Sequence, residues 1–197
     1  MDLYTAIMIC SMFHNNAITN AIIQNGSHEN PLAVTVISQP GQPGAPQTDF
    51  KTVQEAASYT KQQLAAGNHV EIGMMQIPSN WLPLLDQQGV SIDDLFRSCK
   101  NIAVATDLLN QSEAYCTTLT DTNAEAHQCA LSFYKTGDAK QGLDYAKQIL
   151  AYAKNNPLQA NPTNQKIDYN DYLKFAGLAL PPPSFSNEVN DNASDTQ

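Results

Sequence analysis

The chain has 197 residues, of which 42% are hydrophobic, so one globular domain of ordinary size fits its length and composition. Its formal net charge of −9 argues against nucleic acid as a partner, because proteins usually meet a nucleic-acid backbone with a basic face. No apolar run reaches membrane-spanning length, so we expect no stable membrane span. Neutral glycans need no compensating charge and are not excluded.

Two helices are predicted at the start of the chain. Apolar residues favour a first helix from Leu3 to Phe13. This stretch lacks the basic leader and the small-residue cleavage site of a signal peptide, so we expect any secretory signal to precede this numbering. Helical spacing resumes from Ala17 to Asn25, and Gly26 is a usual helix terminator.

The next segments predict a small sheet and a further helix. The β-branched run Val34 to Ile37 favours a strand, and the Pro- and Gly-rich stretch from Gln39 to Pro46 favours an exposed loop. A capping box from Thr52 to Glu55 predicts the start of a helix, and Gly67 is placed to end it. The stretch from Val70 to Ile77 alternates loosely and predicts a second strand.

The remaining chain is predicted to be helical up to a polar end. Helical patterns run from Trp81 to Leu109, interrupted at Gly89, and then cover Ala124 to Tyr134 and Gly142 to Tyr152. The fold class is therefore α+β, mainly α, with one small sheet, in a domain of residues 1–155. Residues 156–197 are rich in Asn, Gln and Pro and are expected to form a partly disordered extension.

Five segments, in this order along the chain, carry the most specific pattern. Residues 26–34 read Gly-Ser-His-Glu-Asn-Pro-Leu-Ala-Val, residues 71–77 read Glu-Ile-Gly-Met-Met-Gln-Ile, and Asn80-Trp81 follows. Residues 95–102 read Leu-Phe-Arg-Ser-Cys-Lys-Asn-Ile, and residues 130–137 read Ala-Leu-Ser-Phe-Tyr-Lys-Thr-Gly. Together they resemble the specialised lytic transglycosylases of type IV secretion and conjugation systems, over roughly Leu3 to Tyr152.

The resemblance implies a lysozyme-like domain that cleaves peptidoglycan and leaves a 1,6-anhydro product. In that family one glutamate acts as acid and then as base, and its position is occupied here by Gly26. Glycine has no side chain and cannot donate the proton that glycosidic cleavage requires. The chain departs from the family again at Pro78 and at Lys135, where asparagine is usual.

The resemblance also implies the other residues of the site. The residues expected to line the glycan subsites or to support position 26 are Ser27, Met75, Gln76, Tyr134 and Tyr145, with Glu71 in a supporting role. For Tyr145 core packing stays open as an alternative, and for Glu71 the structural role of holding its strand is favoured over orienting a donor. Glu29 lies in the same loop as Gly26 and is the candidate substitute acid, the alternative being a solvated loop charge.

No metal or cofactor is expected, because the histidines are scattered and no phosphate-binding loop is present. The cysteines, at positions 10, 99, 116 and 129, show no metal-ligand spacing. On composition alone they could form two disulfides or remain buried thiols. The family resemblance implies a Cys10–Cys99 bridge, which leaves Cys116–Cys129 as the second, and both favour a periplasmic location.

Two functions stay open from the sequence. The chain could be a lytic transglycosylase that opens the glycan mesh for a type IV secretion apparatus, if Glu29 substitutes for the missing glutamate or if Gly26 is an engineered replacement of it. It could instead be a non-catalytic protein that binds peptidoglycan glycan strands and recruits periplasmic components of the secretion system. A glycan-binding domain unrelated to secretion is a third alternative.

Overall fold

The computed structural model describes residues 3–13, 15–37, 46–47 and 49–158. These residues are mainly helical with a small antiparallel sheet, which confirms the predicted α+β, mainly α, class. The elements in chain order are α1 (Leu3–Cys10), α2 (Asn16–Gly26), β1 (Val34–Ile37), β2 (Pro46–Gln47), α3 (Val53–Ala65), β3 (His69–Ile72), β4 (Ile77–Pro78), η1 (Ser79–Trp81), α4 (Leu82–Gln87), η2 (Asp94–Phe96), α5 (Ser98–Cys116), α6 (Asn123–Thr136) and α7 (Leu143–Asn155). The expected partly disordered extension lies outside the described residues beyond Leu158.

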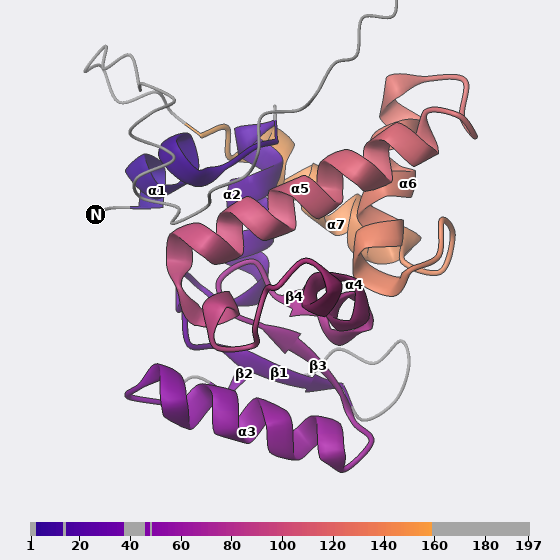
Figure 1. The fold of residues 1–197 in the computed structure, drawn as a ribbon. Coiled ribbons are helices and arrows are strands. Elements are labelled where there is room, and N and C mark those ends of the chain that lie inside the picture. Colours follow the sequence, from indigo (N-terminus) through magenta and orange to yellow (C-terminus); the bar gives the residue numbers. More distant parts are fainter. Residues whose placement is uncertain (1–2, 14, 38–45, 48, 159–197) are drawn as a thin grey trace, which may run out of the picture.

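The sheet lies between α3 and a layer of helices (Figure 1). Its strand order is β2-β1-β3-β4, and every pairing is antiparallel. On the helical side, α5 packs against α1 and α6, and α7 packs against α2 and α6. Helix α2 therefore ends beside the sheet, where its last residue, Gly26, meets the turn between β3 and β4.

Helix caps account for several of the boundaries. The Thr52 hydroxyl accepts a hydrogen bond from the backbone N–H of Glu55 at 3.2 Å, which confirms the predicted start of α3. Thr122 and Glu125 repeat the arrangement at the start of α6. Just after the end of α3, Gly67 adopts a left-handed conformation with φ +83°, as the sequence predicts for a helix stop.

The predicted strand from Val70 to Ile77 is wrong as a continuous element, because residues 73–76 form a tight turn between β3 and β4. Gly73 and Gln76 both have positive φ, at +74° and +52°, and this reverses the chain direction. Met74 and Met75 consequently do not point to opposite faces of a strand. Both are buried, at 7% and 0% exposure.

Other boundaries differ from the predictions for identifiable reasons. Helix α1 ends at Cys10 and not at Phe13, because the backbone N–H of Met12 turns away to donate to Thr106 Oγ1 at 2.9 Å. The predicted helix from Trp81 to Leu109 is divided into η1, α4, η2 and α5. Pro46, placed in the loop by the sequence, pairs with β1 in a two-residue strand.

Both expected disulfides are present. Cys10–Cys99 joins the end of α1 to the start of α5, with 5.2 Å between the Cα atoms. Cys116–Cys129 joins the end of α5 to α6, with 5.7 Å between the Cα atoms. The two bridges therefore fix both ends of α5, and no free cysteine remains.

Candidate functional site

Gly26 is the last residue of α2 and has an ordinary helical conformation, so its backbone does not require glycine. What restricts position 26 is the space left for a side chain. A Cβ atom built on Gly26 would lie 2.7 Å from Cγ of Gln76, which is closer than real Cβ contacts come. A residue with a side chain fits at position 26 only if Gln76 moves.

Gln76 is held where it contacts Gly26. Its side chain is 4% exposed, and its Nε2 donates to the carbonyl of Gly73 at 2.7 Å and to that of Ala33 at 3.4 Å. Its Oε1 accepts a hydrogen bond from Thr35 Oγ1. The amide is thus satisfied by its own turn and by β1, as a buried amide needs to be.

Three further predicted substrate-binding residues gather around the same turn. Ser27 Oγ donates to the carbonyl of Met74 at 2.7 Å, and Tyr134 Oη donates to the carbonyl of Met75 at 2.9 Å. The side chains of Ser27, Met75 and Tyr134 are all buried. The structure therefore brings these residues together, with their side-chain contacts made inside the protein.

Asn101 on α5 holds the turn of residues 73–76 in place. The sequence indicates this residue only as part of the segment 95–102, with no role of its own. Its Oδ1 accepts from the backbone N–H of Met75 at 2.7 Å, and its Nδ2 donates to the carbonyls of Ile72 and Leu95 at 3.0 and 2.7 Å. At Gly73 an added Cβ would collide with the Leu95 carbonyl and with Asn101 Nδ2. Helix α5 therefore sets the shape of the turn that presents Gln76.

A buried ion pair lies on the same face of the sheet. Thr35 and Glu71 are directly opposed across β1 and β3, so their side chains share a face. Glu71 is 6% exposed, and its carboxylate is paired with Lys135 Nζ from α6. The same ammonium lies 4.9 Å from the ring centroid of Tyr145 on α7. Lys135 thus neutralises Glu71.

The two tyrosines of this cluster are not bases at neutral pH. Burial raises the pKa of the Tyr134 and Tyr145 hydroxyls well above the ordinary value, and the nearby Glu71 carboxylate raises both further. Both phenols therefore stay protonated. They can donate hydrogen bonds, as Tyr134 does to the turn.

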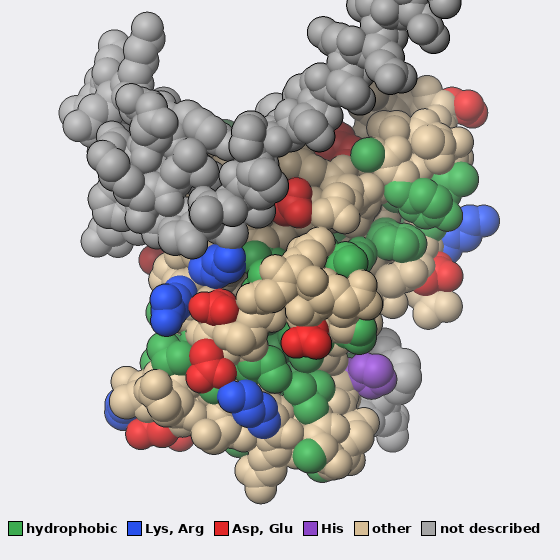
Figure 2. Space-filling model, in the orientation of Figure 1, with side chains coloured by type: hydrophobic (Ala, Val, Ile, Leu, Met, Phe, Trp, Pro, Cys, Tyr) green, Lys and Arg blue, Asp and Glu red, His purple; other side chains and the backbone are tan. Residues whose placement is uncertain are grey.

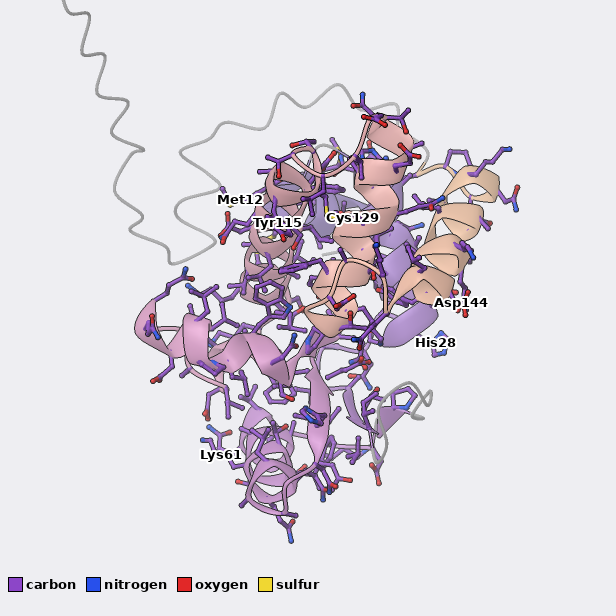
Figure 3. The ribbon with its side chains drawn as sticks, turned by 90° about the vertical axis from the view of Figure 1, so that its right-hand side faces the viewer. Met12, His28, Lys61, Tyr115, Cys129 and Asp144 are labelled. Carbon is purple, nitrogen blue, oxygen red and sulfur yellow. A yellow bond between two sulfur atoms is a disulfide. The ribbon has the colours of Figure 1, made fainter. Side chains whose placement is uncertain are left out.

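Glu29 follows α2 in an exposed turn. Its Oε1 accepts from Gln24 Nε2 at 2.6 Å, which directs the carboxylate back along the helix into solvent. His28 beside it is also exposed, and Figure 3 shows it at the edge of the molecule next to the start of α7, marked by Asp144.

Backbone strain is concentrated around Gly26. Within the described residues, only His28, Glu29 and Gln76 have positive φ without being glycine, with values of 51°, 68° and 52°. Two of them follow Gly26 in the chain and the third packs against it. Such strained residues cluster at functional sites, where the surrounding structure holds them in place.

Two hollows on the described surface lie away from this cluster. One is lined by Asp49, Phe50, Glu55, Ser58, Tyr59 and Gln62, and the other by Phe13, Asn15, Asn16, Glu113 and His127. In the part of the chain that the structure describes, no three His, Cys, Asp or Glu side chains gather as a metal-ligand group, and no helix is long and apolar enough to cross a membrane.

Comparison of the chain with protein-family models, with curated proteins and with solved structures finds no match. The class that fold and site define is therefore a mainly helical α+β protein with two disulfides and a strained, closely packed junction of helix and hairpin at Gly26.

Proposed function

We propose that this protein is a lysozyme-like, non-catalytic relative of the secretion-system lytic transglycosylases, which engages peptidoglycan glycan strands without cleaving them. One observation carries the proposal. Position 26 has no side chain to act as an acid, and the Gln76 side chain, anchored by Thr35 and by its own turn, packs so closely against Gly26 that a Cβ there would require Gln76 to move.

The chemistry of cleavage supports the non-catalytic alternative. Protonating a glycosidic oxygen requires a carboxylic acid whose pKa is raised by a partly apolar pocket. Glu29 lies in solvent, and Glu71 is buried but paired with Lys135. Neither carboxylate has the surroundings of such an acid.

Retention of the remaining family features supports engagement of the glycan. The segments around Gly26, Gln76 and Tyr134 that carry the resemblance meet at one place in the fold, and the backbone strain is kept there. The two disulfides fit an oxidising compartment. We therefore propose a periplasmic location, with glycan strands and periplasmic secretion components as the partners.

Incubation with purified sacculi tests the proposal. We expect the unmodified chain to sediment with sacculi and to release no 1,6-anhydro muropeptides, measured by chromatography with mass detection against an active lytic transglycosylase. Glu29→Gln should change neither result, and Glu125→Gln, an exposed acid on α6, is its matched control. Release of anhydro products that Glu29→Gln abolishes and Glu125→Gln preserves would show a working enzyme. Failure to bind sacculi would refute glycan engagement.

A further inference from the structure

Three aromatic rings from three elements form a continuous row on the surface, which we name the aromatic strip: Tyr115, Phe133 and Trp81. The ring centroids of Tyr115 and Phe133 are 5.3 Å apart, and those of Phe133 and Trp81 are 5.9 Å apart. Tyr115 is 50% exposed at the end of α5, and the other two rings are half-buried. Figure 2 shows hydrophobic side chains gathered where η1 and α4 meet α5 and α6.

The Trp81 end of the strip is held in place before any ligand arrives. The indole Nε1 of Trp81 donates to the carbonyl of Tyr134 at 2.8 Å, which fixes the ring and uses its one polar atom. The Cys116–Cys129 bridge is adjacent to Tyr115 in sequence and lies one helical turn before Phe133, so it fixes α5 against α6 beside the strip. Rings held in place lose little freedom on binding, which favours affinity.

The chemistry of the strip is neutral. The three rings carry no charge, and the neighbouring Asn80 amide is exposed beside Gly137, at the end of the helix that carries Phe133. An aromatic face is electron-rich and attracts partly positive C–H groups, while an amide can exchange hydrogen bonds with hydroxyls. A pyranose offers both, as a C–H face with hydroxyls at its edge. In a chain of net charge −9, this uncharged surface suits a neutral sugar better than an anionic ligand.

We propose that the aromatic strip is a stacking platform for a neutral β-linked N-acetylhexosamine strand, running from the Tyr134 end of the junction at Gly26 outward to Tyr115. Figure 3 places Tyr115 and His28, which follows Gly26, on opposite sides of the molecule. The inference rests on the proposed function, since it names a surface through which the glycan is held. It also explains how a chain without a catalytic acid could grip a glycan strand.

Trp81 is the only tryptophan of the chain, so its fluorescence reports directly on the strip. The experiment titrates the full chain with a soluble hexamer of β-1,4-linked N-acetylglucosamine and records the emission. We expect a saturable change. Tyr115→Leu keeps apolar surface but removes a ring and should weaken binding roughly threefold to tenfold, whereas Tyr115→Phe should bind as the unmodified chain does.

Leu119→Ala is the matched control, because Leu119 is 56% exposed on the adjoining loop and has no ring. Its affinity should be unchanged. Equal loss of hexamer affinity in Leu119→Ala and Tyr115→Leu would overturn ring stacking, because Leu119 has no ring. Unchanged affinity in Tyr115→Leu would overturn the platform. Binding to sacculi without any Trp81 fluorescence response to the hexamer would refute the strip as a sugar platform and leave the proposed function standing. Absence of binding to both would refute the proposed function.

Discussion

Substituting Gly26 by alanine should destabilise this protein, although the same change stabilises most helices. Gly26 is helical, and alanine is preferred over glycine within a helix by up to about 1 kcal/mol. Against this, the new Cβ would lie 2.7 Å from Cγ of Gln76, whose amide is held by three hydrogen bonds. Overpacking of a fixed site costs about 1–3 kcal/mol. We expect a net loss on the order of 1 kcal/mol.

The effect should change sign when Gln76 is removed. Gln76→Gly deletes the atoms that meet position 26, and glycine adopts the +52° φ of this residue without strain. Gln76→Gly alone should destabilise, because the Thr35 hydroxyl loses its acceptor. In that background, however, Gly26→Ala should stabilise by up to about 1 kcal/mol. The coupling between the two changes is then about 1–3 kcal/mol.

Urea unfolding of the four proteins of this cycle, followed by circular dichroism with the disulfides intact, measures the coupling. Gly89→Ala is the control, since a Cβ there meets no atom within 4 Å and its φ of +73° makes alanine costly irrespective of Gln76. Its effect should be the same in both backgrounds. If Gly26→Ala stabilises equally with and without Gln76, position 26 is open and the argument from its close packing is wrong.

Three further variants, one at Asn101 and one at each disulfide, test the structure around the site by the same unfolding measurement. Asn101→Ala should cost about 3 kcal/mol, because three buried backbone groups lose their partner, and a cost below about 1 kcal/mol would contradict its role in holding the turn. Replacing both cysteines of the Cys116–Cys129 bridge by alanine should cost about 3 kcal/mol, and replacing those of Cys10–Cys99 about 4.5 kcal/mol, since their separations are 13 and 89 residues. The opposite order would contradict the chain-entropy reasoning.

Elements with local signals were predictable from the sequence. The capping box at Thr52 fixed the start of α3, and the β-branched run from Val34 to Ile37 forms β1 as expected. The bounds of α2 differ by one residue at each end from the predicted Ala17 to Asn25. In each case the determining interaction joins residues close together in the chain.

The hairpin turn was not predictable, because its cause is distant in sequence. Glutamine is not a residue that signals a left-handed turn, yet Gln76 adopts one while Asn101, on α5, holds the turn at Met75. The ion pair of Glu71 with Lys135 likewise joins β3 to α6, two elements distant in the chain, so no local sequence pattern predicts it. Thr35, the partner of Gln76, carried no functional signal at all.

The exposed left-handed residues His28 and Glu29 have a consequence for how this protein could evolve. Each strained position costs about 1–3 kcal/mol, and glycine would relieve it. A surface without a task gains stability from such replacements and loses nothing. A chain that keeps these two strained residues therefore exchanges stability for a fixed loop geometry. We expect such an exchange to persist only where the shape of the loop matters for binding.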